Sequence, residues 1–241
     1  MAFTRNSLAL AVRAGGVSVL MISAAFMTGC GGDTYSADEL KAAFPAVAEN
    51  SGVAEDKAVL CPFQRMLKRS GILDSALPQG EYEIRNKTLT EAAEVFGCSS
   101  GSCGAAIGYA SLAQGNWNTI EMNRLHEAGF LSHDCGLTFE FGGITVSDTQ
   151  RDATLTRLAE LAVDGRLVYN DLITVKQEIC ASQGVEMTVG GETEVKLIYA
   201  YLGGTERDYV AHSDVDKLLH ATMPDYKSSA VINLSLIGDV Q

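Results

Sequence analysis

The sequence has little proline, no cluster of basic residues and no long apolar run after its N-terminus. Its 241 residues include only 4 prolines, which excludes long proline-rich linkers. There are 18 basic and 30 acidic side chains, giving a net charge of −12, so we expect no binding to nucleic acid. A protein that crosses the membrane several times is also excluded. Hydrophobic residues make up 46% of a chain that is long enough for one sizeable core and short for two.

The first 29 residues have the pattern of a secretory signal that ends at a lipidation site. Arg5 and Arg13 are followed by small and apolar residues up to Met27, a stretch too short for an ordinary membrane-spanning helix. It ends in the sequence MTGC, and small residues before a single cysteine resemble a bacterial lipobox. We therefore expect a lipid anchor on Cys30 and a protein held at the membrane, periplasmic or on the cell surface. An ordinary signal peptide with an unrelated cysteine is the alternative.

The mature chain then divides into a tether over residues 30–40 and one domain over residues 41–241. Apolar residues recur at helical spacing and are bounded by helix start and stop signals. Only Leu137–Val146 alternates around two glycines, which predicts a short hairpin. The fold expected is mainly α, a single globular helical domain with at most a short β-hairpin. Helices are expected from Pro62, from the capping box at Thr88 to Gly97, before Gly129, up to Gly165, from Asn170 to Gly184, up to Gly203 and from Ser213.

Six cysteines in an exported protein favour disulfides. If Cys30 carries a lipid, five cysteines remain, and one of them must be free, intermolecular or a ligand. Cys98 and Cys103 lie in the tight, glycine-bearing sequence CSSGSC and are the easiest pair to close. Cys135 and Cys180 could then join two elements of the domain.

Under this pairing the remaining cysteine is Cys61, although it could instead pair with Cys135 or Cys180. It precedes Pro62 at the start of a predicted helix, where backbone N–H groups and the positive end of the helix dipole favour a thiolate. Thiolate is the form that binds metals, and an unpaired thiolate in a helical exported domain suggests haem ligation.

On these residues the chain resembles the haem-thiolate peroxidases, the family of chloroperoxidase and the unspecific peroxygenases. In that family the cysteine of a Pro-Cys-Pro motif is the proximal iron ligand; residues 60–62 (LCP) match it, with leucine in place of the first proline. The family's Glu-His-Asp-x-Ser motif aligns with residues 132–136 (SHDCG), although residues 150–157 (QRDATLTR) compete for this placement. A third landmark, a Gly-Glu pair that opens a helix, is similar to Gly191-Glu192, and residues 215–224 resemble the closing helix.

The resemblance implies a haem b cofactor, hydrogen peroxide as oxidant and a division of roles among four residues. Cys61 would ligate iron and favour cleavage of the peroxide O–O bond. Glu192 would act as the distal general acid–base, with Glu194 as the neighbouring alternative. His133 would hold the carboxylate in position and Asp134 would fix the imidazole.

The same alignment makes the family's divalent cation doubtful. Ser132 and Gly136 stand where the family has two ligands that help to hold Mg²⁺ against a haem propionate, and both are poor ligands for a hard cation. One of the basic residues Arg65, Lys68 and Arg69 could reach a propionate, but a solvated helix face is the simpler interpretation.

These observations predict a lipid-anchored haem-thiolate peroxidase or peroxygenase that uses hydrogen peroxide to oxidise small organic substrates or halide. The alternative is a lipoprotein that keeps the fold and binds haem or a partner without catalysis. A third hypothesis, a disulfide-stapled lipoprotein without haem, applies if Cys61 is bridged.

Overall fold

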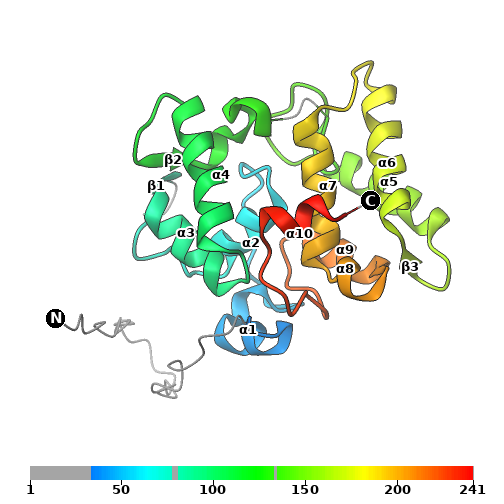
Figure 1. Ribbon diagram of the computed structural model, residues 1–241, viewed down its shortest axis with the longest axis horizontal. Helices are drawn as coiled ribbons and strands as arrows, with labels where there is room; N and C mark the ends of the chain where they lie inside the picture. The colour runs from blue at the N-terminus through cyan, green and yellow to red at the C-terminus, as the bar shows by residue number, and fades with distance from the viewer. Residues whose placement is uncertain (1–33, 78–80, 133–134, 241) are drawn as a thin grey trace. The chain divides into compact units, whose positions relative to one another are not determined.

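The computed structural model describes residues 34–77, 81–132 and 135–240, in which helices form most of the regular structure (Figure 1). The predicted mainly α fold is confirmed. The N-terminal half contains α1 (Ala37–Ala43), α2 (Pro62–Arg69), α3 (Asn86–Val95) and α4 (Ser100–Ala113), with 3₁₀ turns η1 (Pro45–Val47), η2 (Met122–Glu127) and η3 (Gly129–Leu131). The C-terminal half contains α5 (Asp148–Leu161), α6 (Tyr169–Ser182), α7 (Val189–Tyr201), α8 (Gly204–Arg207), α9 (His212–Leu219) and α10 (Leu234–Gly238).

Two short antiparallel strand pairs fasten loops to these helices. Strand β1 (Glu83–Arg85) pairs with β2 (Thr119–Glu121), and β3 (Arg166–Leu167) pairs with β4 (Val210–Ala211). The main helix contacts are α3 with α4, α6 with α7 and α5 with α6, so the chain forms helical layers on either side of α2 (Figure 1). Apolar side chains such as Met66 and Leu67 of α2 are fully buried between these layers.

The predicted hairpin at Leu137–Val146 is wrong. A turn does form, because the Gly143 amide donates to the Glu140 carbonyl at 2.8 Å. On the second arm the Ser147 amide donates across the turn to the Thr138 carbonyl at 2.8 Å, but the Val146 amide donates to the carbonyl of Lys57, so no strand pair forms. The alternating apolar residues, such as Leu137 and Phe139, therefore bury a loop against the core and do not form a strand pair.

Three further expectations need correction. The tether expected to reach residue 40 is shorter, because Ser36 caps α1 and Leu40 is buried in the core. The sequence CSSGSC is not a loop throughout: Ser99 accepts a hydrogen bond from the Ser102 amide and starts α4, with Cys103 inside the helix. Helix α3 likewise begins at Asn86 rather than after Thr88, since β1 ends directly before it.

A buried cluster of charges joins α2 to its neighbours. The Arg65 guanidinium is fully buried; its Nε lies 3.0 Å from Oε2 of Glu55, and it donates to the carbonyls of Val59, Leu60 and Leu219. Arg151 of α5 binds the other oxygen of Glu55. The cluster therefore fixes the loop before α2 against both α5 and α9.

We expect Arg65→Met to destabilise the protein by about 3–5 kcal/mol, because Glu55 loses one buried partner and the carbonyls of Val59 and Leu60 lose their Arg65 donor. The matched control is Arg157→Met, which breaks the exposed Arg157–Glu178 pair and should cost less than about 1 kcal/mol. Urea denaturation of both variants measures the difference. Equal, small losses for the two variants would contradict the role given to Arg65.

Candidate active site

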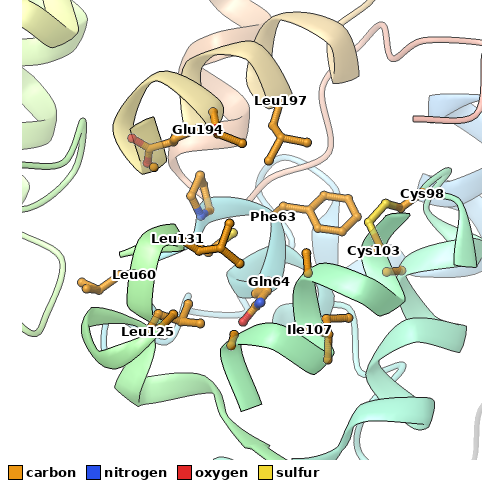
Figure 2. A pocket seen from close by; sticks show the side chains of 18 of the residues that line it. Leu60, Phe63, Gln64, Cys98, Cys103, Ile107, Leu125, Leu131, Glu194 and Leu197 are labelled. Carbon is orange, nitrogen blue, oxygen red and sulfur yellow. A yellow bond between two sulfur atoms is a disulfide. The ribbon is translucent and has the colours of Figure 1, made fainter. Parts of the chain in front are cut away.

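An apolar pocket lies between α2, α4, α7 and the 3₁₀ turns η2 and η3 (Figure 2). Leucine, isoleucine, alanine and phenylalanine side chains form most of its wall. The polar groups in the wall are few, and the described lining residues include no lysine or arginine. The polar and sulfur-bearing lining residues are Cys61, Gln64, Cys98, Cys103, His126, Ser132, Thr193, Glu194 and Tyr201.

Cys61 lies in the wall at the start of α2, as the sequence predicts. It is the N-cap residue, Pro62 occupies the first helical position, and the backbone N–H groups of Phe63 and Gln64 act to lower the pKa of its thiol. It is also the only free cysteine in the described part of the chain. The geometry is that of a sulfur held at a helix N-terminus and directed at a cavity.

The structure corrects one expectation about this sulfur. Burial raises the pKa of the Cys61 thiol above its ordinary value, and the Glu194 carboxylate raises it further. The two backbone N–H groups and Arg65 lower the pKa but do not outweigh burial. Without a bound cation Cys61 is therefore a thiol, and a metal ion would have to displace its proton.

The sulfur's carboxylate neighbour in the pocket is Glu194 and not Glu192. Glu194 lines the pocket from α7 with a side chain that is 12% exposed (Figure 2). Glu192 is 42% exposed, pairs with Lys196 at 3.0 Å and is absent from the pocket wall. Successive helical residues turn by about 100°, so side chains two positions apart point in nearly opposite directions. The structure thus places Glu192 on the outer face of α7.

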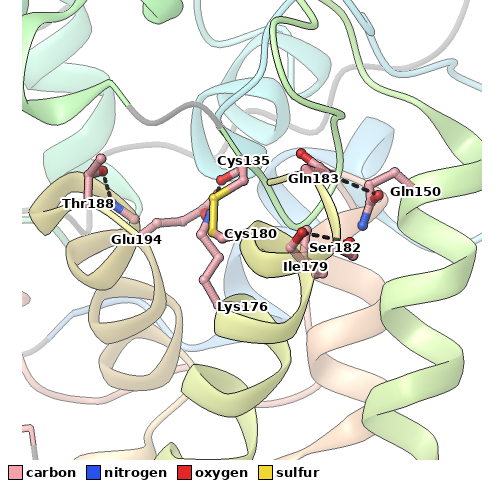
Figure 3. Close-up of a disulfide and its surroundings, with 10 residues drawn as sticks. Cys135, Gln150, Lys176, Ile179, Cys180, Ser182, Gln183, Thr188 and Glu194 are labelled. Atoms are coloured by element: carbon pink, nitrogen blue, oxygen red, sulfur yellow. Dashed lines mark hydrogen bonds and ion pairs between the residues drawn. A yellow bond between two sulfur atoms is a disulfide. The ribbon is translucent and has the colours of Figure 1, made fainter. Parts of the chain in front are cut away.

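A buried lysine holds Glu194 in place (Figure 3). Nζ of Lys176, on α6, lies 2.6 Å from Oε2 of Glu194 and donates to the carbonyl of Cys135 at 2.6 Å. Cys135 is also bonded to Cys180, one helical turn after Lys176. The ion pair and the disulfide therefore tie the chain at Cys135 to α6 and α7 together.

The predicted residues His133 and Asp134 lie outside the described residues. The residues on either side are placed: Ser132 lines the pocket, and Cys135 is fixed by its disulfide and by Lys176. The proposed roles of His133 and Asp134 stay predictions.

The position aligned with a cation-binding serine cannot carry a ligand without rearrangement. A Cβ atom at Gly136 would lie 2.0 Å from Cε1 of Phe139, whose ring lines the pocket. The Gly136 amide also donates to the Phe139 carbonyl at 3.2 Å. An aromatic ring thus fills the space that a ligand side chain at position 136 would need, which disfavours the family's Mg²⁺ site.

Both predicted disulfides are present. Cys98 is bonded to Cys103, and this bridge lines the pocket beside Phe63 (Figure 2). Cys135 is bonded to Cys180. The alternative in which Cys61 takes one of these partners is therefore excluded by the pairing, and the bonds indicate a non-reducing, exported environment.

The three basic residues of α2 do not form a solvated helix face, because each one binds a partner within the protein. Lys68 pairs with Asp56, and its ammonium group lies 3.8 Å from the centre of the Tyr82 ring. Arg69 donates to the hydroxyl of Thr222 at 2.7 Å, and Arg65 belongs to the buried cluster above. None of the three lines the pocket.

His126 is a pocket residue that the sequence did not single out. It lies on η2, with Nε2 3.3 Å from a carboxylate oxygen of Glu127. The irregular 3₁₀ geometry of η2 breaks the helical periodicity around Leu125, so spacing gave no indication of which side chains face the pocket.

No model of a known protein family matches the chain, and no curated protein is similar to it in sequence. The argument for function therefore rests on the pocket itself.

A haem held through sulfur would meet the following groups in this pocket. A single thiol faces an apolar cavity, two backbone N–H groups are aimed at its sulfur, and a carboxylate stands in the same cavity. Because the described wall has no basic side chain, the carboxylates of a haem would be met by His126 or by solvent.

The reactivity of Cys61 tests this electrostatic picture without any cofactor. We expect slow alkylation by iodoacetamide at neutral pH, with a rate that rises as pH passes above the ordinary thiol range. Glu194→Gln removes a charge that raises the pKa of Cys61, so alkylation should accelerate by about three- to tenfold at a fixed pH. Peptide mapping by mass spectrometry gives the rate at Cys61.

The matched control is Glu192→Gln on the outer face of the same helix, which should leave the rate unchanged. Equal acceleration in both variants, or none in Glu194→Gln, would contradict the placement of Glu194 beside Cys61.

Proposed function

We propose that this protein is an exported, lipid-anchored haem-thiolate peroxidase or peroxygenase that uses hydrogen peroxide to oxidise small organic substrates or halide. The observation that carries the proposal is the presence in one apolar pocket of an unpaired cysteine at a helix N-terminus and a buried carboxylate, Glu194. A carboxylate is costly to bury without a partner, and a core built only for stability would not need the buried Glu194–Lys176 pair.

Cys61 is the residue that would hold haem b, through its sulfur. The bound haem supplies peroxide activation at its iron, and thiolate ligation favours cleavage of the O–O bond. The protein supports the charged sulfur through the N–H groups of Phe63 and Gln64 and through the charge of Arg65. Burial disfavours a thiolate that has no cation beside it. Binding of a cation to the sulfur would therefore stabilise its charged form.

Glu194 replaces Glu192 in the proposal as the distal acid–base. Its task is to accept a proton from one peroxide oxygen and return it to the other. The buried ammonium of Lys176 lies 2.6 Å from the Glu194 carboxylate and directs it. In the proposal, Glu194 is the proton acceptor at the start of the reaction. His133, with Asp134 behind it, remains the proposed second partner of this carboxylate.

The pocket wall favours apolar organic substrates. Leu89, Ile107, Leu125 and Ile198 are among the side chains that line it, and its polar groups are few. Binding of an apolar substrate to such a wall is favourable because it removes apolar surface of both partners from water.

The proposed location follows from the same features. The disulfides indicate export, and within residues 34–240 no described helix has the length and apolar character needed to cross a membrane. We propose attachment through a lipid on Cys30, which the N-terminal sequence motif supports.

A non-catalytic haem-binding or interaction lipoprotein is the second candidate. It is favoured by Phe139, whose ring stands where the resemblance places a cation ligand, and by the absence of basic residues from the described pocket wall. Such a protein would take up haem and show no peroxide-dependent turnover.

Peroxide turnover by two variants of the haem-loaded protein tests the proposal. Glu194→Gln should keep haem and reduce turnover by about 10²–10⁴-fold, because the general acid–base is lost. Glu192→Gln changes a carboxylate on the same helix outside the pocket and should retain full turnover. Turnover is followed by oxidation of a chromogenic phenol.

Haem binding without turnover in the unmodified protein would favour the non-catalytic candidate. Loss of turnover in Glu192→Gln with full activity in Glu194→Gln would return the acid–base role to Glu192. Absence of haem binding would contradict both candidates.

A further inference from the structure

Two segments of this acidic chain carry no charged side chain. Residues 95–120 contain no lysine, arginine, aspartate or glutamate, although Glu94 and Glu121 stand at their ends. Residues 228–238 are likewise uncharged, between Lys227 and Asp239. Charged residues make up 20% of the chain, so two uncharged stretches of this length within the described domain are unusual in their lack of charge.

The fold brings the two segments together. The Ser99 amide donates to the carbonyl of Ile232 at 2.9 Å, and the Leu234 amide donates to Oγ of Ser102 at 3.0 Å. The first turn of α4 is therefore bonded to the start of α10. Together they form one uncharged surface, which we call the α4–α10 face, extended at its far end by the loop after α4.

Large apolar side chains are exposed on this surface. Leu234 stands beside the first turn of α4, Tyr109 and Leu112 project from the middle and end of α4, and Trp117 follows in the loop. Trp117 is 81% exposed, which is unusual for the most costly apolar side chain to leave in water. Tryptophan is the residue most characteristic of the boundary between lipid and water.

The chain leaves the domain at the edge of this face. Thr34, the first described residue, donates from Oγ1 to the carbonyls of Ser228 and Ser229 and accepts from Nζ of Lys227. It also lies against Gly97, directly before α4. Three residues lie between Cys30 and Thr34, and the four Cα–Cα steps that join them span at most about 14 Å in a fully extended chain. A lipid on Cys30 would therefore hold this edge close to the bilayer.

We propose that the α4–α10 face rests on the surface of the lipid bilayer, with Trp117 and Leu112 in the interface. The inference depends on the proposed lipid at Cys30 and not on haem chemistry. An acidic protein approaches a bilayer with least repulsion through a face without charges, and the exposed apolar groups gain free energy on leaving water. The inner side of α4, through Ile107 and Ala110, lines the pocket, so the pocket then lies directly above the membrane surface.

The single tryptophan of the chain reports on this docking directly. The full-length lipoprotein is reconstituted on phosphatidylcholine vesicles, and Trp117 emission is compared with that of the same protein in detergent-free buffer. We expect emission at shorter wavelength, weaker quenching by aqueous acrylamide, and added quenching when the vesicles contain lipid brominated on its acyl chains. The same protein on vesicles without brominated lipid serves as the reference and corrects for any quenching by haem.

Two variants make the test specific. Leu112→Glu places a charge on the proposed face and should abolish the emission shift and the quenching by brominated lipid. Val163→Glu changes a residue that is 72% exposed in the turn between α5 and β3, outside this face, and should behave as the unmodified protein does. Both positions are exposed and neither lines the pocket, so folding should be preserved in each.

Vesicle flotation distinguishes failure of the docking face from failure of the lipid anchor. Protein that floats with the vesicles while Trp117 stays fully open to acrylamide overturns the docking face and leaves the lipid anchor standing. Protein that does not float overturns the proposal together with the anchor. An emission shift that appears without lipid and grows with protein concentration shows a second copy of the chain on this face, and also overturns the proposal.

Discussion

The buried guanidinium of Arg65 is the constraint on which the pocket depends. It reaches the carbonyls of Val59 and Leu60, the two residues directly before Cys61, and the carbonyl of Leu219 at the end of α9. A buried charge is tolerable only with a partner, and the Glu55 carboxylate supplies it. Arg65 thus holds Leu60, the residue directly before Cys61, through a hydrogen bond to its carbonyl.

A second buried cation, Lys176, holds Glu194, the carboxylate in the pocket wall. Lys176 is as fully buried as Arg65, and it too combines a carboxylate partner with a backbone carbonyl. Two buried cations, each paired with a carboxylate, thus support the pocket from outside its wall, and the described wall itself contains no lysine or arginine. Glu194 is the carboxylate that faces the cavity, and Lys176 is its buried cationic partner. The arrangement places one thiol and one carboxylate in an otherwise apolar space.

Sequence alone was sufficient for features that depend on local chemistry. The helix start at Pro62 placed Cys61 at an N-terminus, and the spacing in CSSGSC favoured the bridge Cys98–Cys103. The partner of Cys135 was left open between Cys180 and Cys61, and the fold decides for Cys180. Helical spacing also predicted the mainly α fold. These inferences need only neighbouring residues, the geometry of one helix turn or the redox compartment.

Features that depend on tertiary packing were not predictable. Which of Glu192 and Glu194 faces the pocket depends on how α7 is rotated against α6, and its apolar residues do not decide a difference of two positions. Helix α4 has small, uncharged residues on every side, so it lacks the periodic contrast that reveals a helix. The pKa of Cys61 depends on burial by distant elements, which outweighs the helix N-terminus that the sequence does show.

The most direct test of the central claim is the identity of the iron ligand. The full-length protein is loaded with haem, reduced and exposed to carbon monoxide, beside a Cys61→Ser variant treated in the same way. The account predicts the strongly red-shifted Soret band typical of thiolate-ligated iron in the unmodified protein, and its loss in the variant. A band at the position typical of imidazole-ligated haem, or the same spectrum from both proteins, would contradict the assignment of Cys61.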